Sequence, residues 1–193
     1  MDPSVTVVSN TGGFGIDGIL SSLIGASFSN RSKLFYAIIG DLAFFYDMNA
    51  LGNRHIENNV RVLLINNGRG IEFRNYDHPA QAFEDKADLF MAAAGHFGNQ
   101  SPTLVKHYAE DLGFEYISAK NKEEFINSIG HFLNPEPTSK PVFFEVFTEY
   151  EKESDALKLV RCCRQTISGH LKTKVKNVIG DSGVKVIKRI IGK

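Results

Sequence analysis

The chain has 193 residues, of which 42% are hydrophobic and 23% charged, and its formal net charge is zero. This length and composition predict one globular domain of ordinary size, with or without an appendage, and the balanced charge gives no general reason to expect a nucleic-acid partner. The start of the sequence lacks a basic region followed by an apolar core, and no apolar run reaches membrane-spanning length, so we expect a cytoplasmic protein.

The two cysteines, Cys162 and Cys163, are adjacent and fall within a helical pattern. They lack CxxC spacing and a nearby pair of histidines, so they indicate neither a zinc site nor a disulfide framework. This usage fits a reducing compartment.

The N-terminal part predicts a strand, a glycine-rich turn and a helix. Residues 5 to 9 are mainly β-branched and predict a first strand, residues 10 to 18 read Asn-Thr-Gly-Gly-Phe-Gly-Ile-Asp-Gly, and residues 16 to 28 predict a helix. Glycines in such a turn allow positive φ angles and close approach of a ligand. A tight connection also needs glycine, so the turn alone does not decide between a structural and a binding role.

The central part, residues 34 to 73, predicts a βαβ unit. Residues 34 to 39 and 60 to 65 are short apolar runs typical of buried parallel strands, and residues 42 to 51 carry an apolar stripe at helical spacing. The unit carries Asp41 and Asn67 to the carboxyl ends of two parallel strands, where ligands bind in open α/β sheets.

Strands and helices continue to alternate after residue 100. We expect helices at residues 103–112 and 122–133 and strands at 114–118 and 141–147. The fold class is therefore α/β, a doubly wound and mostly parallel sheet of about five or six strands with helices on both faces.

The connection from residue 74 to residue 100 is long and polar, with one short helical patch at residues 87–94. It contains His78 and His96, which are candidates for proton transfer because histidine titrates near neutral pH. A loop histidine is more often simply solvated, and the sequence leaves both roles open.

The last part of the chain is basic, and we divide the sequence into a domain at residues 1–150 and a helical extension at 151–193. From residue 156 onward the sequence has ten basic residues and one acidic residue, Asp181. The bases are Lys158, Arg161, Arg164, Lys172, Lys174, Lys176, Lys185, Lys188, Arg189 and Lys193. The interleaved apolar residues predict amphipathic helices that either bind a membrane surface or partner, or, as we favour, pack on the domain or on another subunit with the lysines solvated.

Asp41 and Asn67 suggest a metal and diphosphate site. A carboxylate and an amide oxygen, with a loop carbonyl near Arg69, are hard ligands that suit Mg²⁺, and phosphate oxygens would complete its shell. Backbone N–H groups near Leu42 and Ala43 would face the same anion. The GxxxxGK[ST] phosphate loop is absent from the sequence.

These motifs carry a resemblance. Gly40-Asp41, the gap that follows and Asn66-Asn67 are similar to the signature GDG, twenty-odd residues, NN of thiamine-diphosphate-dependent enzymes, with Leu42 in place of the second glycine. Together with the turn at residues 10–18, they most resemble the C-terminal, diphosphate-binding domain of the 2-succinyl-5-enolpyruvyl-6-hydroxy-3-cyclohexene-1-carboxylate synthases, over roughly residues 5 to 150.

The resemblance implies roles for individual residues. Asp41 and Asn67 would bind Mg²⁺ through their side chains, and Arg69 through its carbonyl. Ile16 would hold thiamine diphosphate in its bent conformation, although without the resemblance it reads as a core residue at a helix start. The other cofactor-binding residues that the resemblance implies are Gly15, Gly40, Leu42, Ala43 and Ile71.

The resemblance also has limits. Thr11 stands where the family has an arginine that handles a substrate carboxylate, so the substrate is not implied. The pyrimidine-binding domain that activates the cofactor has no counterpart here, so we expect a subunit or fragment of a 2-oxo-acid decarboxylase or carboligase, inactive alone and partnered by that domain, with a homodimer as the expected assembly. The alternatives are a non-catalytic assembly or binding module with a basic tail, and a flavodoxin-like nucleotide binder.

Overall fold

The computed structural model describes residues 5–11, 15–74, 78–80, 82, 83, 86 and 100–163. The chain divides into two compact units, Met1–Lys152 and Glu153–Lys193. Helix α5 (Tyr150–Cys163) runs from the end of the first unit into the second, so the two adjacent cysteines are helical, as predicted. The rest of the basic extension, from residue 164, lies outside the described residues.

The first unit contains the alternating strands and helices that the sequence predicts. They are α1 (Ile19–Ser29), β1 (Phe35–Gly40), α2 (Asp41–Asp47), the 3₁₀ helix η2 (Met48–Gly52), β2 (Val60–Asn66), the 3₁₀ helix η3 (Ile71–Arg74), α3 (Leu104–Asp111), β3 (Glu115–Ala119), α4 (Lys122–Phe132) and β4 (Val142–Phe147). The predicted helix at residues 42–51 is thus an α-helix that tightens into a 3₁₀ turn. Within the described residues, no helix is long and apolar enough to cross a membrane.

The four strands form one sheet in the order β1-β2-β4-β3, and every neighbouring pair is parallel. This confirms the α/β class. The sheet has fewer strands than the five or six expected, counted over the described part of the chain.

The predicted first strand at residues 5–9 is wrong. The described segment 5–11 contains no strand, and Val5, Val7 and Val8 are each more than half exposed. A β-branched run becomes a strand only where it finds a sheet edge and a face to pack on, and this run has neither in the structure.

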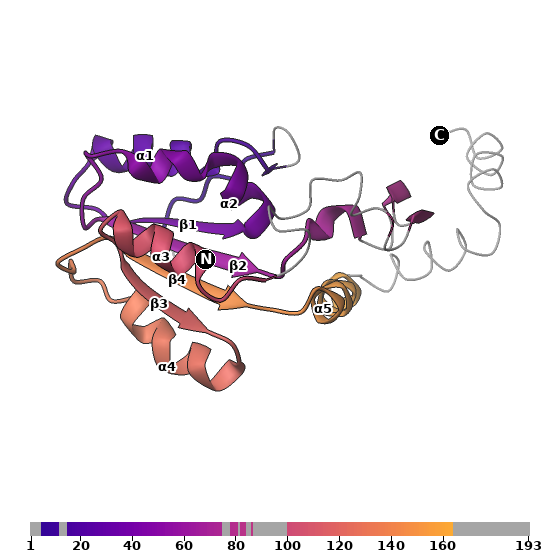
Figure 1. Cartoon of the computed structure of the whole chain (residues 1–193). Coiled ribbons are helices and arrows are strands. Elements are labelled where there is room, and N and C mark those ends of the chain that lie inside the picture. Colours follow the sequence, from indigo (N-terminus) through magenta and orange to yellow (C-terminus); the bar gives the residue numbers. More distant parts are fainter. Residues whose placement is uncertain are drawn as a thin grey trace. The chain divides into compact units, whose positions relative to one another are not determined.

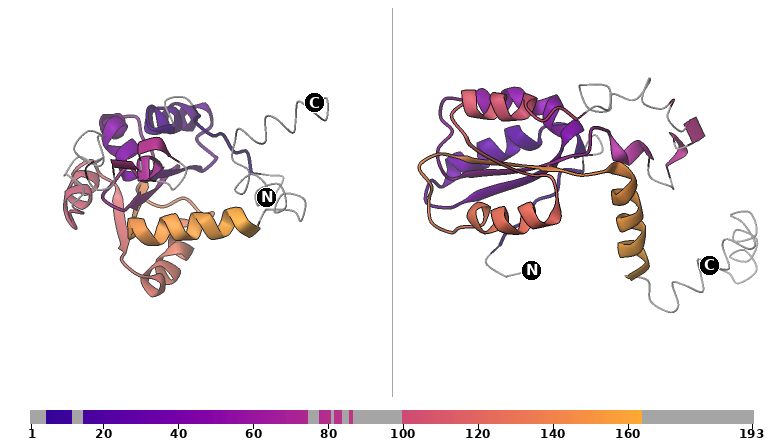
Figure 2. Two further views of the ribbon diagram at one scale, coloured as in Figure 1. Left: turned by 90° about the vertical axis from the view of Figure 1, so that its right-hand side faces the viewer. Right: turned by 60° about the horizontal axis from the view of Figure 1, so that its bottom comes forward.

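Helices cover both faces of the sheet. Helices α1, α2 and α3 lie on one face and α4 on the other (Figures 1 and 2). Because side chains alternate along a strand, Val62 and Leu64 of β2 pack in the first layer while Leu63 packs under α4. The Phe44 ring of α2 meets the Phe143 ring of β4 edge-on, with centroids 5.5 Å apart, which fixes α2 over the centre of the sheet.

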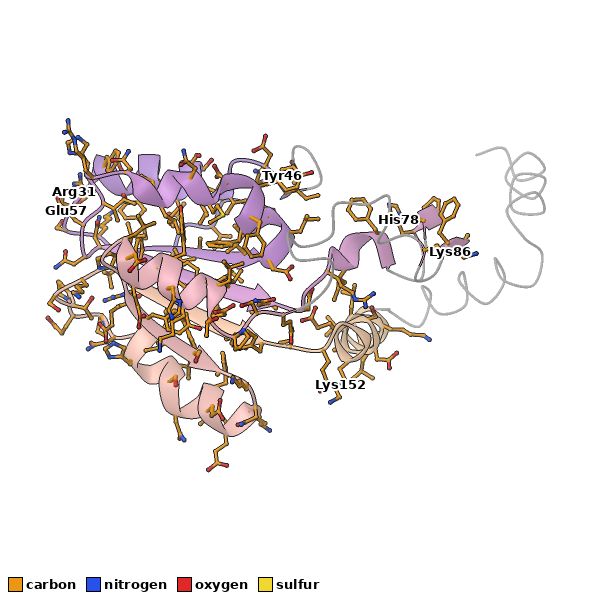
Figure 3. All side chains as sticks on the ribbon, viewed as in Figure 1. Arg31, Tyr46, Glu57, His78, Lys86 and Lys152 are labelled. Atoms are coloured by element: carbon orange, nitrogen blue, oxygen red, sulfur yellow. The ribbon has the colours of Figure 1, made fainter. Side chains whose placement is uncertain are left out.

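The start of α1 is tied to the end of α2. The N-cap residue of α1, Gly18, has no side chain and adopts φ 79°. The Asp47 carboxylate takes over its role, because it accepts hydrogen bonds from the Ser21 backbone N–H at 2.7 Å and from the Ser21 hydroxyl at 2.6 Å. At the amino end of the sheet, Arg31 and Glu57 form an ion pair of 3.5 Å between two loops (Figure 3).

Candidate functional site

The carboxyl ends of the four parallel strands lie along one edge of the sheet (Figure 1). Asp41 follows β1 directly and Asn67 follows β2. The two strands are paired neighbours, with Gly40 opposite Ile65, so the residues after them leave the sheet at the same edge. This is the edge at which open α/β sheets bind ligands.

Asp41 is a buried carboxylate at the beginning of α2. It is 1% exposed, and its Oδ1 accepts a hydrogen bond of 2.8 Å from the Leu42 backbone N–H. Leu42 and Ala43 are buried in the first turn of the helix, behind Gly40, which ends β1. A buried carboxylate requires compensation by hydrogen bonds or by a cation. Its position at the end of a strand therefore makes Asp41 a candidate cation ligand.

The turn after β2 is built by two successive asparagines. The Asn66 Oδ1 accepts from the Gly68 N–H at 3.2 Å, and the Asn67 Oδ1 accepts from the Arg69 N–H at 2.9 Å. Gly68 has φ 78°, a conformation that favours glycine. The turn leaves Asn67 and Arg69 half-buried at the edge of the sheet.

The structure brings this turn against the start of α2. A Cβ atom added to Gly70 would lie 2.8 Å from Leu42 Cδ2 and 3.2 Å from Phe73 Cδ2, so glycine permits the approach. Ile71 follows as the half-buried first residue of η3. The two motifs after β1 and β2 are therefore in contact through Leu42 and Gly70.

The glycine-rich turn forms a separate part of the candidate site. Gly15 has φ 73°, and a Cβ there would lie 2.9 Å from the Asn10 carbonyl oxygen. The Asn10 side-chain amide in turn donates to the Asp17 carbonyl. Ile16 is half-buried ahead of α1, whose start is tied to Asp47 at the far end of α2. Residues 12–14 of the turn lie outside the described residues.

Of the two candidate histidines, the structure describes His78. Its Nδ1 accepts a hydrogen bond of 3.1 Å from the Ala80 N–H, and its ring meets Phe73 edge-on at 5.5 Å (Figure 3). Both contacts are local to the connection after η3. His96 and the helix predicted at 87–94 lie outside the described residues.

Three polar side chains, of which the sequence motifs include only Asn66, lie together on the sheet, and we call them the polar row: Tyr116 of β3, Glu145 of β4 and Asn66 of β2. Glu145 accepts hydrogen bonds from the Tyr116 hydroxyl at 2.6 Å and from the Asn66 Nδ2 at 2.7 Å. Burial raises the pKa of the Glu145 carboxyl, an effect that these two hydrogen bonds oppose, and burial also raises the pKa of Tyr116. The sequence feature that could have indicated the polar row is the single glutamate inside the apolar run Val-Phe-Phe-Glu-Val-Phe, because a buried carboxyl group requires hydrogen-bond partners.

The donor atoms at this edge suit a hard cation. Over the described residues, no group of three or more His, Cys, Asp and Glu side chains could hold a metal. An ion at Asp41 would therefore complete its shell with amide and carbonyl oxygens, such as those of Asn67 and Arg69, and with oxygens of its ligand. That oxygen set fits Mg²⁺ and not zinc, which prefers nitrogen and sulfur.

The fold places the chain in the class of doubly wound α/β domains, which bind ligands at the carboxyl edge of their sheets. No protein-family model matches the chain. It is 37% identical over 155 residues to 2-succinyl-5-enolpyruvyl-6-hydroxy-3-cyclohexene-1-carboxylate synthase of Bacteroides fragilis, an alignment that covers 80% of this chain and 26% of the relative. The same-named synthases of Phocaeicola vulgatus and Flavobacterium johnsoniae are 38% and 47% identical, over 81% and 77% of this chain and 26% and 25% of theirs.

The chain is thus a homologue of part of these synthases, which are thiamine-diphosphate-dependent enzymes, and its resemblance to that family is confirmed. It spans about a quarter of the length of the curated relatives that it matches.

Proposed function

We propose that the chain is the Mg²⁺- and diphosphate-binding part of a thiamine-diphosphate-dependent 2-oxo-acid decarboxylase or carboligase. The observation that carries the proposal is the contact between Leu42 and Gly70, which joins the buried Asp41 to the turn that carries Asn67. The homology to thiamine-diphosphate-dependent synthases supports the same assignment.

Each residue of the edge has a defined task in this proposal. Asp41 supplies one anionic oxygen to the metal, Asn67 an amide oxygen and Arg69 its carbonyl oxygen. These ligands carry a single negative charge, which is too little for a divalent ion, so the site favours a metal that arrives with a diphosphate. Gly70 keeps the turn close to the start of α2, because a larger residue would meet Leu42.

The rest of the cofactor site is assigned to a second protein region. When bound, thiamine diphosphate supplies a carbanion centre and an electron sink for the decarboxylation of 2-oxo acids. In this chain Gly15 and Ile16 would pack against the middle of the cofactor and set its bend. A pyrimidine-binding domain, on a longer form of the chain or on another polypeptide, would complete the site, and we propose a homodimer as the assembly.

Calorimetric titration of the full 193-residue chain with thiamine diphosphate tests the proposal. We expect heat of binding with Mg²⁺ and much less in excess EDTA, because Asp41, Asn67 and the Arg69 carbonyl would hold a metal whose charge would attract the diphosphate. Asp41→Ala and Asn67→Ala should each weaken binding about 10-fold or more, and unchanged affinity in both would contradict the proposal.

Asn134→Ala is a matched control for Asn67→Ala. The Asn134 Oδ1 also accepts from the backbone N–H two residues ahead, that of Glu136, at 3.0 Å. It lies between α4 and β4, at the amino end of the strands. The Asn134→Ala variant therefore removes the same kind of turn hydrogen bond at a position away from the site, and cofactor affinity should not change.

The charge asymmetry of the sequence favours a second candidate, a non-catalytic assembly or binding module that uses its basic extension. The sequence from residue 156 to residue 193 has ten basic residues and one acidic residue. Size-exclusion chromatography with light scattering separates the candidates. A dimer that is strengthened by thiamine diphosphate and Mg²⁺ supports the enzyme assignment, and a monomer indifferent to both supports the module.

A further inference from the structure

The polar row crosses three strands and ends at the turn that carries Asn67. Tyr116 lies opposite Phe143 and reaches diagonally to Glu145, and Asn66 lies opposite Phe147 and reaches diagonally back to the same carboxylate. Glu145 and Asn66 are fully buried. A carboxyl group placed so deeply in a sheet needs a reason, because an apolar residue there would pack at lower cost.

The side-chain amide of Asn66 has two ends, and the polar row selects which end faces the turn. A carboxylate only accepts hydrogen bonds, so Glu145 attracts the Nδ2 end. The Oδ1 end then faces the Gly68 N–H, to which it is bonded at 3.2 Å. Tyr116 occupies the other carboxylate oxygen at 2.6 Å, which leaves Oε1 for Asn66.

The backbone of Asn66 is anchored independently. Its carbonyl oxygen accepts from the Thr148 N–H at 3.0 Å and from the Gln100 Nε2 at 2.7 Å. The strand end is therefore fixed, and the rotation of the Asn66 side chain is the remaining variable that determines whether the Gly68 N–H has its acceptor.

We propose that Glu145 and Tyr116 are positioning residues for the metal-binding turn: by orienting the Asn66 amide, they hold the turn in the shape that presents the Asn67 side chain and the Arg69 carbonyl to the cation. This inference rests on the function proposed above. It assigns a role in metal binding to two residues that lie on strands β3 and β4, away from both motifs.

Two Tyr→Phe variants of the full chain separate positioning from stability. Tyr116→Phe removes a hydroxyl from the polar row, and Tyr108→Phe removes one that donates to the Met48 carbonyl at 2.8 Å. Both should lower thermal stability. Only Tyr116→Phe and Glu145→Gln should shift the Gly68 amide resonance, and they should weaken Mn²⁺ binding in the presence of thiamine diphosphate about 10-fold, as measured by water-proton relaxation.

A charge swap provides the rescue. Asn66→Asp alone places two carboxylates in contact and should weaken Mn²⁺ binding. In the double variant Asn66→Asp and Glu145→Gln, the Gln amide donates to the Asp carboxylate, which again accepts from the Gly68 N–H. We expect most of the Mn²⁺ affinity and the native Gly68 resonance to return, whereas a merely structural effect would add the two losses.

The outcomes distinguish this inference from the function on which it rests. If the unmodified chain binds no Mn²⁺ with thiamine diphosphate even when a pyrimidine-binding domain is supplied, the proposed function is wrong and the metal role of the polar row is wrong with it. If the unmodified chain binds and the Tyr116 and Glu145 variants bind equally well, this inference alone is overturned. A shifted Gly68 resonance with unchanged Mn²⁺ affinity overturns it as well.

Discussion

The carboxylate of Glu145 lies in surroundings that disfavour its charge. Burial raises its pKa, and the hydrogen bonds from Tyr116 and Asn66 compensate only in part. The folded chain therefore holds a proton on this residue at a pH where the unfolded chain has released it. Folding stability must then fall as the pH rises from the ordinary glutamate pKa through the raised one, and become level above it.

Glu145→Gln isolates this dependence, because the amide does not titrate. The variant should gain stability relative to the unmodified chain as the pH rises through that range, by at most about 1.4 kcal/mol per pH unit. Urea unfolding at a series of pH values measures the difference. The control is Glu123→Gln, on the exposed first turn of α4, where water solvates the carboxylate and little change is expected. A difference between Glu145→Gln and the unmodified chain that stays constant with pH would contradict the argument.

Gly70 illustrates how a missing side chain can shape the site. In Gly70→Ala the new Cβ would lie 2.8 Å from the buried Leu42 side chain, so the turn or the leucine must move. We expect a loss of about 1–3 kcal/mol in unfolding free energy, with weaker binding of Mg²⁺ and thiamine diphosphate. Urea unfolding and calorimetry measure the two effects.

Gly25→Ala is the opposite case and serves as its control. Gly25 lies in the interior of α1, and apart from its chain neighbours and the backbone of its own helix no atom is within 4 Å of the position of a Cβ there. Alanine should therefore stabilise the chain by about 0.5–1 kcal/mol through helix propensity. If both glycine variants changed stability in the same direction, steric contact at Gly70 would not be the cause.

At the scale of elements, α1 depends on α2 for its N-terminal cap. Asp47→Ala removes the acceptor of both Ser21 hydrogen bonds, and Gly18 offers no side chain in its place. We expect a loss of about 1–2 kcal/mol in unfolding free energy. Asp111→Ala, at the exposed end of α3, removes a carboxylate that caps no helix start and should have a small effect. Chemical denaturation measures the unfolding free energy of both variants. Equal losses of unfolding free energy would show that the Asp47 cap is unimportant.

The same scale shows what the sequence could predict. The runs that became β1, β2 and β4 are mostly apolar, as the strands of a parallel sheet usually are. β2 and β4 are buried along most of their length, whereas one side of β1 is exposed at Tyr36 and Ile38, so the expectation of a fully buried strand at residues 34–39 is wrong. Residues 5–9 have similar composition and form no strand, because pairing depends on a neighbour that local sequence does not specify. Composition predicts which segments can join a sheet, and the tertiary structure decides which of them do.

Site residues follow the same division. The positions of the candidate ligands Asp41 and Asn67 were predictable, because each directly follows a parallel strand and therefore lies at the carboxyl edge of the sheet. The polar row was not, because it depends on β4 lying between β2 and β3, an order that places Glu145 between Tyr116 and Asn66. No pattern in a single sequence gives that strand order.

At the scale of the whole molecule, the small negative charge of the proposed metal ligands predicts that Mg²⁺ and thiamine diphosphate bind cooperatively. Asp41 is the one carboxylate among the proposed ligands, so Mg²⁺ alone should bind weakly, and diphosphate without metal would be repelled by that carboxylate. Because the cation and the diphosphate would attract each other at this edge, each should increase the affinity of the other by the same factor. In thermal unfolding of the full chain, Mg²⁺ or thiamine diphosphate alone should raise the melting temperature little, and the two together should raise it by more than the sum.

Removing the metal tests the same coupling in reverse. EDTA should abolish the increase in melting temperature caused by thiamine diphosphate. Asp41→Asn should abolish the same increase even in excess Mg²⁺, because the neutral amide removes the charge that holds the metal. Asn134→Ala should keep the full increment, since its turn lies at the opposite edge of the sheet. Additive shifts, or a shift by thiamine diphosphate that persists in EDTA, would mean that the cofactor binds without a metal bridge and that Asp41 serves the fold instead.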